Sequence, residues 1–415
     1  MRLSLKYGEE EKEIFIPDKN YLGTLRPRQI PAVKNPEKEI ERALRHPLGA
    51  PRLKELVSSK DAVVILVSDI SRPSPSHIIL PPVLKELKEA GVPSQKITLV
   101  FGLGIHRNQT EEEKKALLGE AIYSRFRCLE HDPAKCDYLG ETSQGTPIEV
   151  FNEVLEASFV IATGNLEYHY YAGFSGGAKA LAPGVCSRRT IEQNHKKFLA
   201  PGARPGEIRG NPIREELEEI AQTIGIDFMV NVVLNPDKQV IKAVAGDVTQ
   251  AHRQGASFLD QISRVYVQEK ADIVLVSPGG FPRDIDLYQT HKAMEHAIPA
   301  LKDGGILITV GQCQDGLGVK PFTQVFNEGK TPQELVDELK KKFVQGRHVA
   351  SRIAHIHLNT EIFLVSDLSE DIKDKLFFKN FESVDEALSL ALDKIGKDAH
   401  VLVMPYGIST LPFVG

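Results

Sequence analysis

The segment Asp61-Ala62-Val63-Val64-Ile65-Leu66-Val67 contains a continuous apolar run, residues 62–67, that predicts a buried strand. Residues 77–90, which follow it, have the apolar spacing of a helix. Further predicted strands lie at 96–102 and 157–162, with a helix at 110–118 between them. Strands that alternate with helices are typical of a parallel sheet covered on both faces. The sequence therefore predicts an α/β fold.

The same alternation returns near residue 270, where we place a domain boundary. Strands are predicted at 271–276, 304–310, 361–366 and 400–404, and helices at 287–302, 331–343 and 383–395. We therefore expect two Rossmann-like α/β domains, residues 1–270 and 271–403, with the active site in the cleft between them. The tail, residues 404–415, is expected to pack back on the N-terminal domain.

Composition excludes several classes of protein. The 415 residues are 41% hydrophobic, carry a formal net charge of -5 and contain no basic tract, which argues against nucleic-acid binding. The apolar runs are strand-sized and too short to cross a bilayer, and the N-terminus lacks the apolar core of a signal peptide. The four cysteines have no C-x-x-C spacing, as in proteins of a reducing compartment. We expect a cytoplasmic protein that binds neither nucleic acid nor membranes.

Polar residues follow three of the predicted strands directly. Asp69-Ile70-Ser71-Arg72 follows the first strand, Gly104-Ile105-His106 the second, and residues 164–169 the third. Ligands in open α/β sheets bind at the carboxyl ends of the strands. These three loops are therefore expected to converge on one site.

Residues 174–179 form a glycine-rich segment that ends in Lys179. It is not a P-loop, because that motif needs Gly before the lysine and Ser or Thr after it. The glycines would still let backbone N–H groups approach an anion. Lys179 is either a phosphate partner or a covalent attachment point, since a desolvated lysine is a nucleophile. A solvated lysine after a turn is the alternative.

Three histidines are candidates for chemistry. Residues 190–193 have the pattern of a capping box, which would start a helix at Thr190 and place His195 in its second turn. A neutral imidazole there suits nickel, copper or zinc. His106 and His169 stand at strand ends, where histidine can exchange a proton near neutral pH. Taken singly, each of the three could equally be a surface or backbone-bonded histidine.

Two further groups could bind anions or hydroxyl groups. Asp69 and Ser71 can bond ribose hydroxyls, and Arg72 can clamp a carboxylate or phosphate, although a turn with a helix cap would use the same residues. Gln289 and Lys292 are three residues apart and share one helix face, so they could bind a substrate carboxylate from across the cleft. The spacing of residues 286–289 also fits a helix cap.

With these residues together, the chain resembles the nickel-dependent lactate racemase family. The resemblance runs from Asp61 through the tail. It is densest in six segments, residues 68–73, 102–107, 131–133, 169–179, 190–195 and 284–292.

The resemblance implies a nickel-pincer nucleotide, a pyridinium mononucleotide that holds nickel through two sulfur atoms and one ring carbon. By position, Lys179 matches the lysine that tethers this cofactor covalently through a thioamide, and His195 matches the protein ligand of the nickel. Separate maturation enzymes make the tether in this family. The cofactor-binding residues would be Asp69, Ile70, Ser71, Arg72, Lys179 and His195.

The resemblance also implies the reaction. The C2 centre of a 2-hydroxy acid, lactate or a relative, would be inverted by reversible hydride transfer to the cofactor, with His106 and His169 as the paired acid/base groups. The residues that contact the substrate would be Arg72, Tyr288, Gln289 and Lys292. An NAD-dependent 2-hydroxy-acid dehydrogenase is one alternative, but the G-x-G-x-x-G turn it needs is missing after the first strand. A non-catalytic nickel or nucleotide carrier is another.

Overall fold

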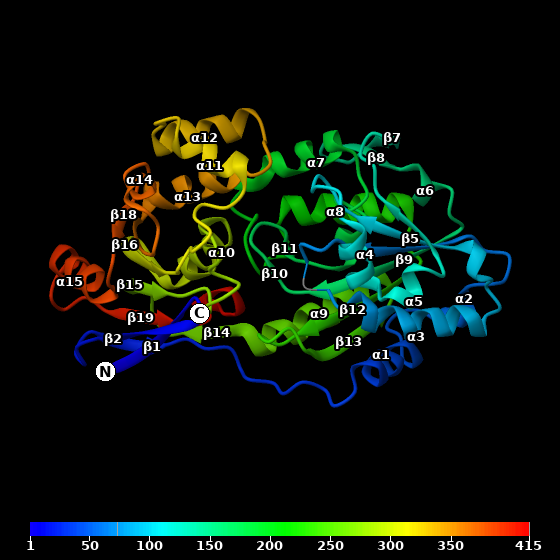
Figure 1. Ribbon diagram of the computed structural model, residues 1–415, viewed down its shortest axis with the longest axis horizontal. Coiled ribbons are helices and arrows are strands. Elements are labelled where there is room, and N and C mark those ends of the chain that lie inside the picture. Colours follow the sequence, from blue (N-terminus) through cyan, green and yellow to red (C-terminus); the bar gives the residue numbers. More distant parts are fainter. Residues whose placement is uncertain (73, 415) are drawn as a thin grey trace. The chain divides into compact units, whose positions relative to one another are not determined.

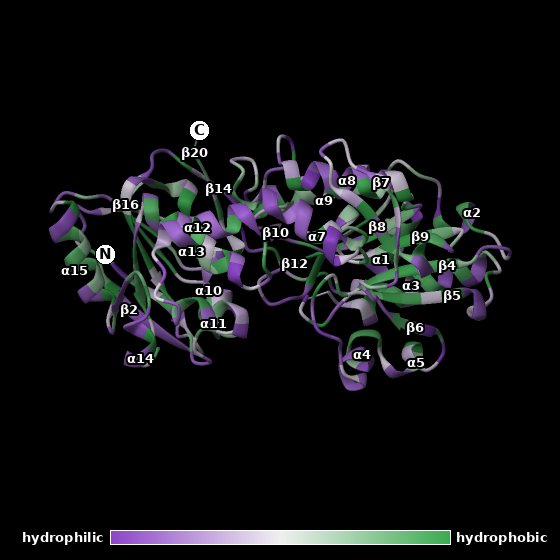
Figure 2. Cartoon of the chain, turned by 90° about the horizontal axis from the view of Figure 1, so that it is seen from above, coloured by the Kyte–Doolittle hydropathy of each residue, from purple (hydrophilic) through white to green (hydrophobic). Residues whose placement is uncertain are grey.

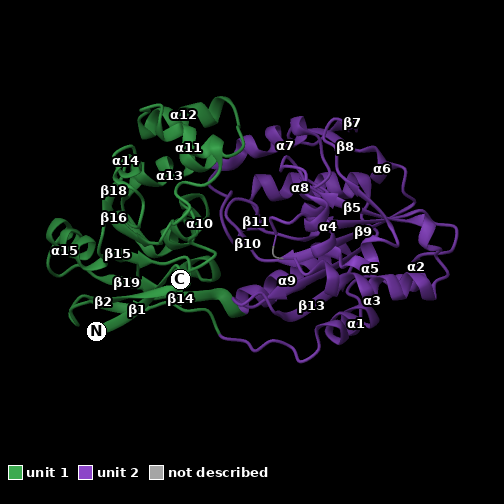
Figure 3. Cartoon of the chain, in the orientation of Figure 1, with its two compact units in different colours: residues 1–28, 262–415 green, residues 29–261 purple. Residues whose placement is uncertain are grey.

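The structure is a computed structural model that describes residues 1–72 and 74–414 (Figure 1). Contacts divide the chain into unit 1, residues 1–28 with 262–415, and unit 2, residues 29–261 (Figure 3). This division differs from the boundary expected near residue 270, because the first 28 residues belong with the C-terminal part. Strand β3 (Tyr21–Thr24) pairs with β19 (Val401–Met404). The tail strand β20 (Leu411–Val414) pairs with β14 (Arg264–Val267), also in unit 1.

Unit 2 is built on a six-stranded sheet in the order β13-β12-β9-β4-β5-β6, parallel except for the antiparallel pair of β12 and β13. These strands are β4 (Val63–Ser68), β5 (Ile97–Gly102), β6 (Arg127–Glu130), β9 (Phe159–Leu166), β12 (Phe228–Leu234) and β13 (Val240–Gly246). The predicted strands at 61–67, 96–102 and 157–162 are confirmed as β4, β5 and β9. The longer helices of unit 2 are α1 (Pro36–Arg45), α3 (Ser76–Glu89), α4 (Glu111–Leu118), α7 (Arg188–His195), α8 (Pro212–Ile224) and α9 (Val248–Ser263).

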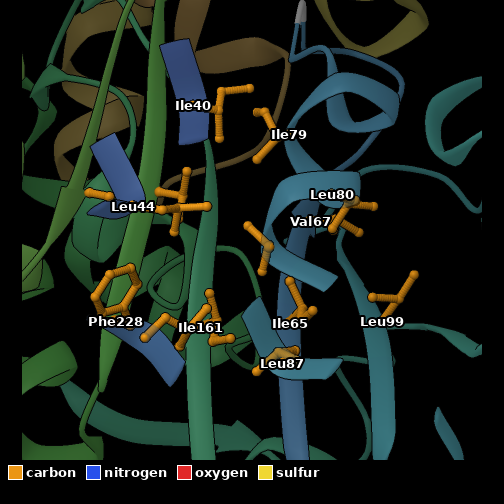
Figure 4. Packing of buried hydrophobic residues seen from close by; sticks show 14 of the residues in the cluster. Ile40, Leu44, Ile65, Val67, Ile79, Leu80, Leu87, Leu99, Ile161 and Phe228 are labelled. Carbon is orange, nitrogen blue, oxygen red and sulfur yellow. The ribbon is translucent and has the colours of Figure 1, made fainter. Parts of the chain in front are cut away.

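The core of unit 2 lies between this sheet and the helices α1 and α3 (Figure 4). Ile65 and Ile161, on neighbouring strands, belong to one buried cluster with Leu87 of α3 and Ile40 of α1, and all four side chains are buried. Strands buried on both faces read as unbroken apolar runs, which explains the sequence of β4 and its green colour in Figure 2.

The order of strands fixes where a ligand can bind in unit 2. From β4 the chain proceeds to β5 and β6 on one side of the sheet, and then to β9 and β12 on the other. The order therefore reverses between β4 and β9, and ligands in such sheets bind outside the carboxyl ends of the strands at that point. The loops that begin at Asp69 and Glu167 leave from these two ends.

Unit 1 has its own six-stranded parallel sheet, in the order β18-β17-β16-β15-β19-β3. The remaining strands are β15 (Ala271–Val276), β16 (Leu301–Val310), β17 (Glu361–Val365) and β18 (Lys379–Phe381), and a hairpin of β1 (Arg2–Tyr7) and β2 (Glu10–Phe15) packs on the same core. The longer helices are α10 (Leu287–Ala297), α11 (Lys320–Phe326), α12 (Pro332–Lys341), α13 (Arg347–Asn359) and α15 (Val384–Ile395).

Shorter elements complete the fold. In unit 2 they are α2 (Leu53–Leu56), α5 (Glu120–Tyr123), β7 (Cys136–Glu141), β8 (Pro147–Phe151), α6 (Asn152–Leu155), β10 (Tyr168–His169), β11 (Gly173–Phe174) and the 3-10 turn η2 (Gly177–Ala180). In unit 1 the short helix is α14 (Glu370–Lys373). Among all the residues that the structure describes, no helix has the length and apolarity needed to cross a membrane.

Replacing Ile161 by Ala should destabilise unit 2 by about 2–5 kcal/mol, because the side chain is 0% exposed and its loss leaves a cavity in the centre of the sheet. Urea unfolding of the purified protein measures the change. The matched control is Leu139→Ala, at a side chain that is 46% exposed, where a shift within about 0.5 kcal/mol is expected. Equal effects of the two substitutions would contradict this account of the core.

Candidate active site

A buried aspartate joins the loops after β4 and β5. Asp69 Oδ2 lies 2.7 Å from His106 Nδ1, and Asp69 Oδ1 accepts a 2.7 Å hydrogen bond from the backbone N–H of Ser71. Burial disfavours the charge on Asp69, but the hydrogen bond and charge of His106, together with the charge of Arg72, hold its pKa below the ordinary value. An ionised carboxylate can only accept hydrogen bonds. The proton is therefore on His106 Nδ1, which leaves Nε2 as the basic nitrogen.

Gln109 supports the same loop and carried no signal in the sequence. Its Oε1 accepts a 2.8 Å hydrogen bond from the backbone N–H of Ile70, and the backbone N–H of Gln109 donates to Glu130 Oε1 at 2.6 Å. The side chain of Gln109 is buried. Its contact with Ile70 joins residues 39 positions apart in the chain, so no local motif could indicate it.

His169 sits in a tight hairpin of β10 and β11, in which it pairs with Gly173. The Nδ1 atom of His169 accepts a 3.3 Å hydrogen bond from the backbone N–H of Ala172, and its ring stacks on Tyr170 at 5.1 Å. Burial, followed by the charges of Lys179 and Arg72, lowers the pKa of His169 well below its ordinary value. The neutral ring, with Nδ1 as acceptor, carries its proton on Nε2.

The glycines before Lys179 shape the chain for packing. Gly173 has a φ of +74°, and a Cβ there would lie 1.9 Å from the carbonyl oxygen of Glu207. Gly177 has a φ of +58°, and its N–H donates a 2.8 Å hydrogen bond to Asn231 Oδ1. The N–H of Gly177 is thus used by a side chain of β12, so it does not serve the anion contact that the sequence suggested for this segment.

Lys179 is half-buried on η2, and its Nζ lies 5.5 Å from the ring centroid of Tyr171. Burial, followed by the charges of Arg72 and Arg214, lowers the pKa of Lys179 well below its ordinary value. Within residues 1–72 and 74–414, no carboxylate forms an ion pair with this amine. These surroundings favour a neutral, nucleophilic amine over a solvated ammonium group.

His195 is the last residue of α7 and is 4% exposed, so it is a core residue and not a surface histidine. The helix begins at Arg188, with Ser187 as its N-cap, whose side chain accepts from the N–H of Thr190. The predicted start at Thr190 is therefore wrong. Thr190 instead donates a 2.8 Å hydrogen bond to the carbonyl of Pro147, which ties α7 to β8.

A chain of polar contacts fixes the ring of His195. Its Nδ1 lies 3.1 Å from Asn194 Oδ1, and Asn194 Nδ2 lies 3.0 Å from Glu216 Oε2. Lys197 Nζ lies 2.5 Å from the same carboxylate oxygen. On the other side of the ring, the hydroxyl of Tyr171 lies 2.7 Å from His195 Nε2.

Two buried basic side chains hold the segment between His169 and Lys179. Arg214 is 0% exposed, and its guanidinium donates to the carbonyls of Ala172, at 3.1 Å, and Phe174. His252 lies 3.0 Å from the carbonyl of Ser175 through Nε2. Both residues lie on amphipathic helices, α8 and α9, and their spacing gave no reason to single them out.

The expected substrate-binding residues lie in unit 1, on α10. Asp286 Oδ1 accepts a 2.6 Å hydrogen bond from the N–H of Gln289, so the helix cap is confirmed. Lys292 Nζ donates a 2.7 Å hydrogen bond to Gln289 Oε1, which confirms that the two share a face. Tyr288 packs against Phe322 at 5.5 Å. Because the histidines and Lys179 belong to unit 2, a joint site with these residues stays a prediction.

No cluster of three or more His, Cys, Asp or Glu side chains able to hold a metal occurs in the described part of the chain.

Two known domains match this chain, the lactate racemase N-terminal domain over residues 7–206 and the lactate racemase C-terminal domain over residues 266–411. A lactate racemase of Thermoanaerobacterium thermosaccharolyticum is 32% identical over 99% of this chain and 98% of its own length, and one of Lactiplantibacillus plantarum is 32% identical over 99% of both. The chain belongs to the lactate racemase family. It is therefore an isomerase, as the resemblance implied.

The fold agrees with this membership. The structure of the lactate racemase apoprotein from Thermoanaerobacterium thermosaccharolyticum superposes with a TM-score of 0.93, at 31% identity and with 100% of both chains covered. A Thermotoga maritima protein, 17% identical, superposes with a TM-score of 0.67 over 92% of this chain and 99% of its own, which shows a shared fold alone. The predicted α/β class is confirmed.

The racemase should lose stability as the pH falls from 7 to 5. Burial lowers the pKa of His131 to about 4 and that of His252 well below its ordinary value, so the folded protein keeps both rings neutral. The unfolded chain takes up these protons near pH 6.5, so each histidine costs up to about 1.4 kcal/mol per pH unit below that value.

Denaturant unfolding of wild type and His252→Gln at several pH values measures this dependence. The variant lacks the proton that His252 takes up on unfolding, so its free energy of unfolding should fall less steeply as the pH is lowered. A slope identical to that of the wild type would contradict the assignment of a neutral ring to His252.

Proposed function

We propose that this lactate racemase family member inverts the C2 centre of a 2-hydroxy acid, lactate or a close relative, with a nickel-pincer nucleotide held by Lys179 and His195. One observation carries the proposal. The amine of Lys179 and the Nε2 atom of His195 both border the ring of Tyr171, at 5.5 Å from its centroid and 2.7 Å from its hydroxyl. A nucleophilic amine and an imidazole around one aromatic ring suit a tethered, nickel-bearing ring.

The residues present fit such a group. A neutral Lys179 can form an amide-type bond, and an imidazole nitrogen with a lone pair is a suitable nickel ligand. Arg72 and the backbone of residues 69–72, at the carboxyl end of β4, would supply cationic and polar contacts for the nucleotide. When bound, the group supplies an acceptor for the hydrogen of C2 together with its electron pair, which is later returned.

The two histidines start as different tautomers, which sets what each must do in the reaction. His106 carries its proton on the Nδ1 that faces Asp69, so its Nε2 can remove the proton of the substrate hydroxyl. His169 is a neutral ring in the free protein, with its proton on Nε2. It must therefore take up a second proton, at Nδ1, before it can return the Nε2 proton to the oxygen on the opposite face, because a neutral ring that gave up its proton would be left as an imidazolate. The anionic substrate and nucleotide would favour this uptake. After one turnover the two rings have exchanged states, and the reverse reaction uses them in the opposite order.

Removing the proton of the substrate hydroxyl is easier than removing the proton on C2. The C2–H bond beside a carboxylate is a very weak acid, so a histidine alone cannot ionise it efficiently. Taking the O–H proton while hydrogen leaves C2 with its electrons gives a planar 2-keto acid and avoids the carbanion. Arg72, Tyr288, Gln289 and Lys292 are the proposed contacts of the substrate.

The proposal is tested with protein made alongside maturation enzymes of the family. Intact mass, nickel content and a chiral screen of 2-hydroxy acids should reveal a covalent adduct, bound nickel and racemisation of one of the acids. Lys179→Ala should lose the mass increase and the activity together. Racemisation without an adduct, or net consumption of added NAD, would instead indicate a different mechanism.

Replacing His106 or His169 by Gln should lower kcat about 10²–10⁴-fold, because each variant lacks one of the two proton-transfer groups. The adduct at Lys179 and the nickel content should stay at wild-type levels. Initial rates from each enantiomer, with mass and metal analysis of the same samples, make the measurement. Full activity in both variants would reject these roles.

Asp69→Asn should also lower kcat, by about 10²–10⁴-fold, while the protein keeps its fold. The amide has a similar shape, but its N–H₂ group can face His106 Nδ1, which would then hold the proton on the wrong nitrogen. A thermal unfolding curve serves as the structural control. A kcat equal to that of the wild type would mean that the tautomer of His106 is set by another group.

A further inference from the structure

The hydroxyl of Tyr171 occupies the position that a metal ligated by His195 would need. It lies 2.7 Å from His195 Nε2, and the Tyr171 ring meets the imidazole edge-on at 5.0 Å between centroids. A hydrogen bond at this atom and a metal at this atom use the same lone pair, so they exclude each other.

The direction of this hydrogen bond follows from the polar chain on the other side of the ring. Glu216 is fully buried, accepts from Thr142 at 2.6 Å and lies against Lys197, so its carboxylate stays ionised. A carboxylate only accepts, hence Asn194 presents its N–H₂ group to Glu216 and its oxygen to His195. Nδ1 of His195 therefore carries the proton, Nε2 is the acceptor, and Tyr171 is the donor.

We propose that Tyr171 is a placeholder for the metal, whose hydroxyl bonds Nε2 of His195 in the metal-free protein and must leave it when the metal binds. The inference rests on the function proposed above. Asn194 is a positioning residue, because it holds the tautomer of His195 in which Nε2 offers a lone pair, in both states.

The surroundings of Tyr171 allow only a local exchange. Its carbonyl accepts a 2.8 Å hydrogen bond from Asn211 Nδ2, and its ring packs edge-on against Phe198 at 4.9 Å and His169 at 4.4 Å. The backbone is therefore anchored and the ring can shift only slightly, so the hydroxyl moves off Nε2 when the metal binds but remains close enough to compete for that atom. The hydrogen bond from Tyr171 also keeps the imidazole of His195 oriented in the metal-free protein, so no entropy is lost in ordering this ring when the metal binds.

The experiment compares wild type, Tyr171→Phe and the control Tyr168→Phe, each made alongside the maturation enzymes. Tyr168 lies in the same hairpin, but its hydroxyl bonds Asp260 Oδ1 at 2.8 Å. The readout is the rate at which a chelator removes nickel from the loaded proteins. Without the competing hydroxyl, Tyr171→Phe should lose nickel about 2- to 12-fold more slowly, and Tyr168→Phe at the wild-type rate. Asn194→Ala should lose it faster than wild type.

An unchanged or faster loss of nickel from Tyr171→Phe, with Tyr168→Phe unchanged, would overturn the proposal. If the wild type carries neither nickel nor an adduct at Lys179, the proposed function fails instead.

A second measurement needs no cofactor, so it tests the placeholder role of Tyr171 separately from the proposed function. In ¹⁵N-histidine-labelled metal-free protein, the Nε2 resonance of His195 should shift in Tyr171→Phe and stay in place in Tyr168→Phe. A resonance that is the same in all three proteins would show that Tyr171 does not hold Nε2, and the placeholder role would be rejected. Thermal unfolding of the metal-free variants shows whether each is folded.

Discussion

The site of unit 2 depends on one buried cation. The guanidinium of Arg214 is inaccessible to solvent and is bonded to the carbonyls of Ala172 and Phe174. Burying an arginine is costly unless its N–H groups are satisfied, so the carbonyls and the guanidinium hold each other in place. These bonds fix the backbone of residues 172–174 in a tight bend, which brings His169 and Lys179 to the ring of Tyr171.

That arginine also sets the electrostatics of the site. Arg214 and Arg72 both act on Lys179, and both lower its pKa in addition to the effect of burial. Two permanent cations next to an amine oppose a third positive charge and attract anions. A nucleotide phosphate and a substrate carboxylate are the anions that the proposed reaction brings. The positive charges of Arg72 and Arg214, which keep Lys179 reactive, are thus the charges that the bound phosphate and carboxylate would neutralise.

Much of the fold could be predicted from the sequence, because the central strands are unbroken apolar runs and the candidate groups follow them directly. Asp69 and His106 could be grouped since the carboxyl ends of parallel strands meet at one edge, and the structure pairs them. Contacts made by distant segments could not be predicted. Neither Arg214 nor the hydroxyl of Tyr171 has a local pattern that indicates its partner, and the start of α7 depends on Ser187, just outside the pattern at residue 190.

The pairing of β3 with β19 constrains the order in which the protein can assemble. Residues 21–24 belong to a sheet whose neighbouring strand lies at 401–404, whereas unit 2 is a continuous stretch of chain between them. During synthesis, unit 2 has all its strands long before the partner of β3 leaves the ribosome. Strand β3 must therefore stay unpaired while unit 2 folds, although the hairpin of β1 and β2 can form locally, and β3 joins its sheet only after β19 has been made.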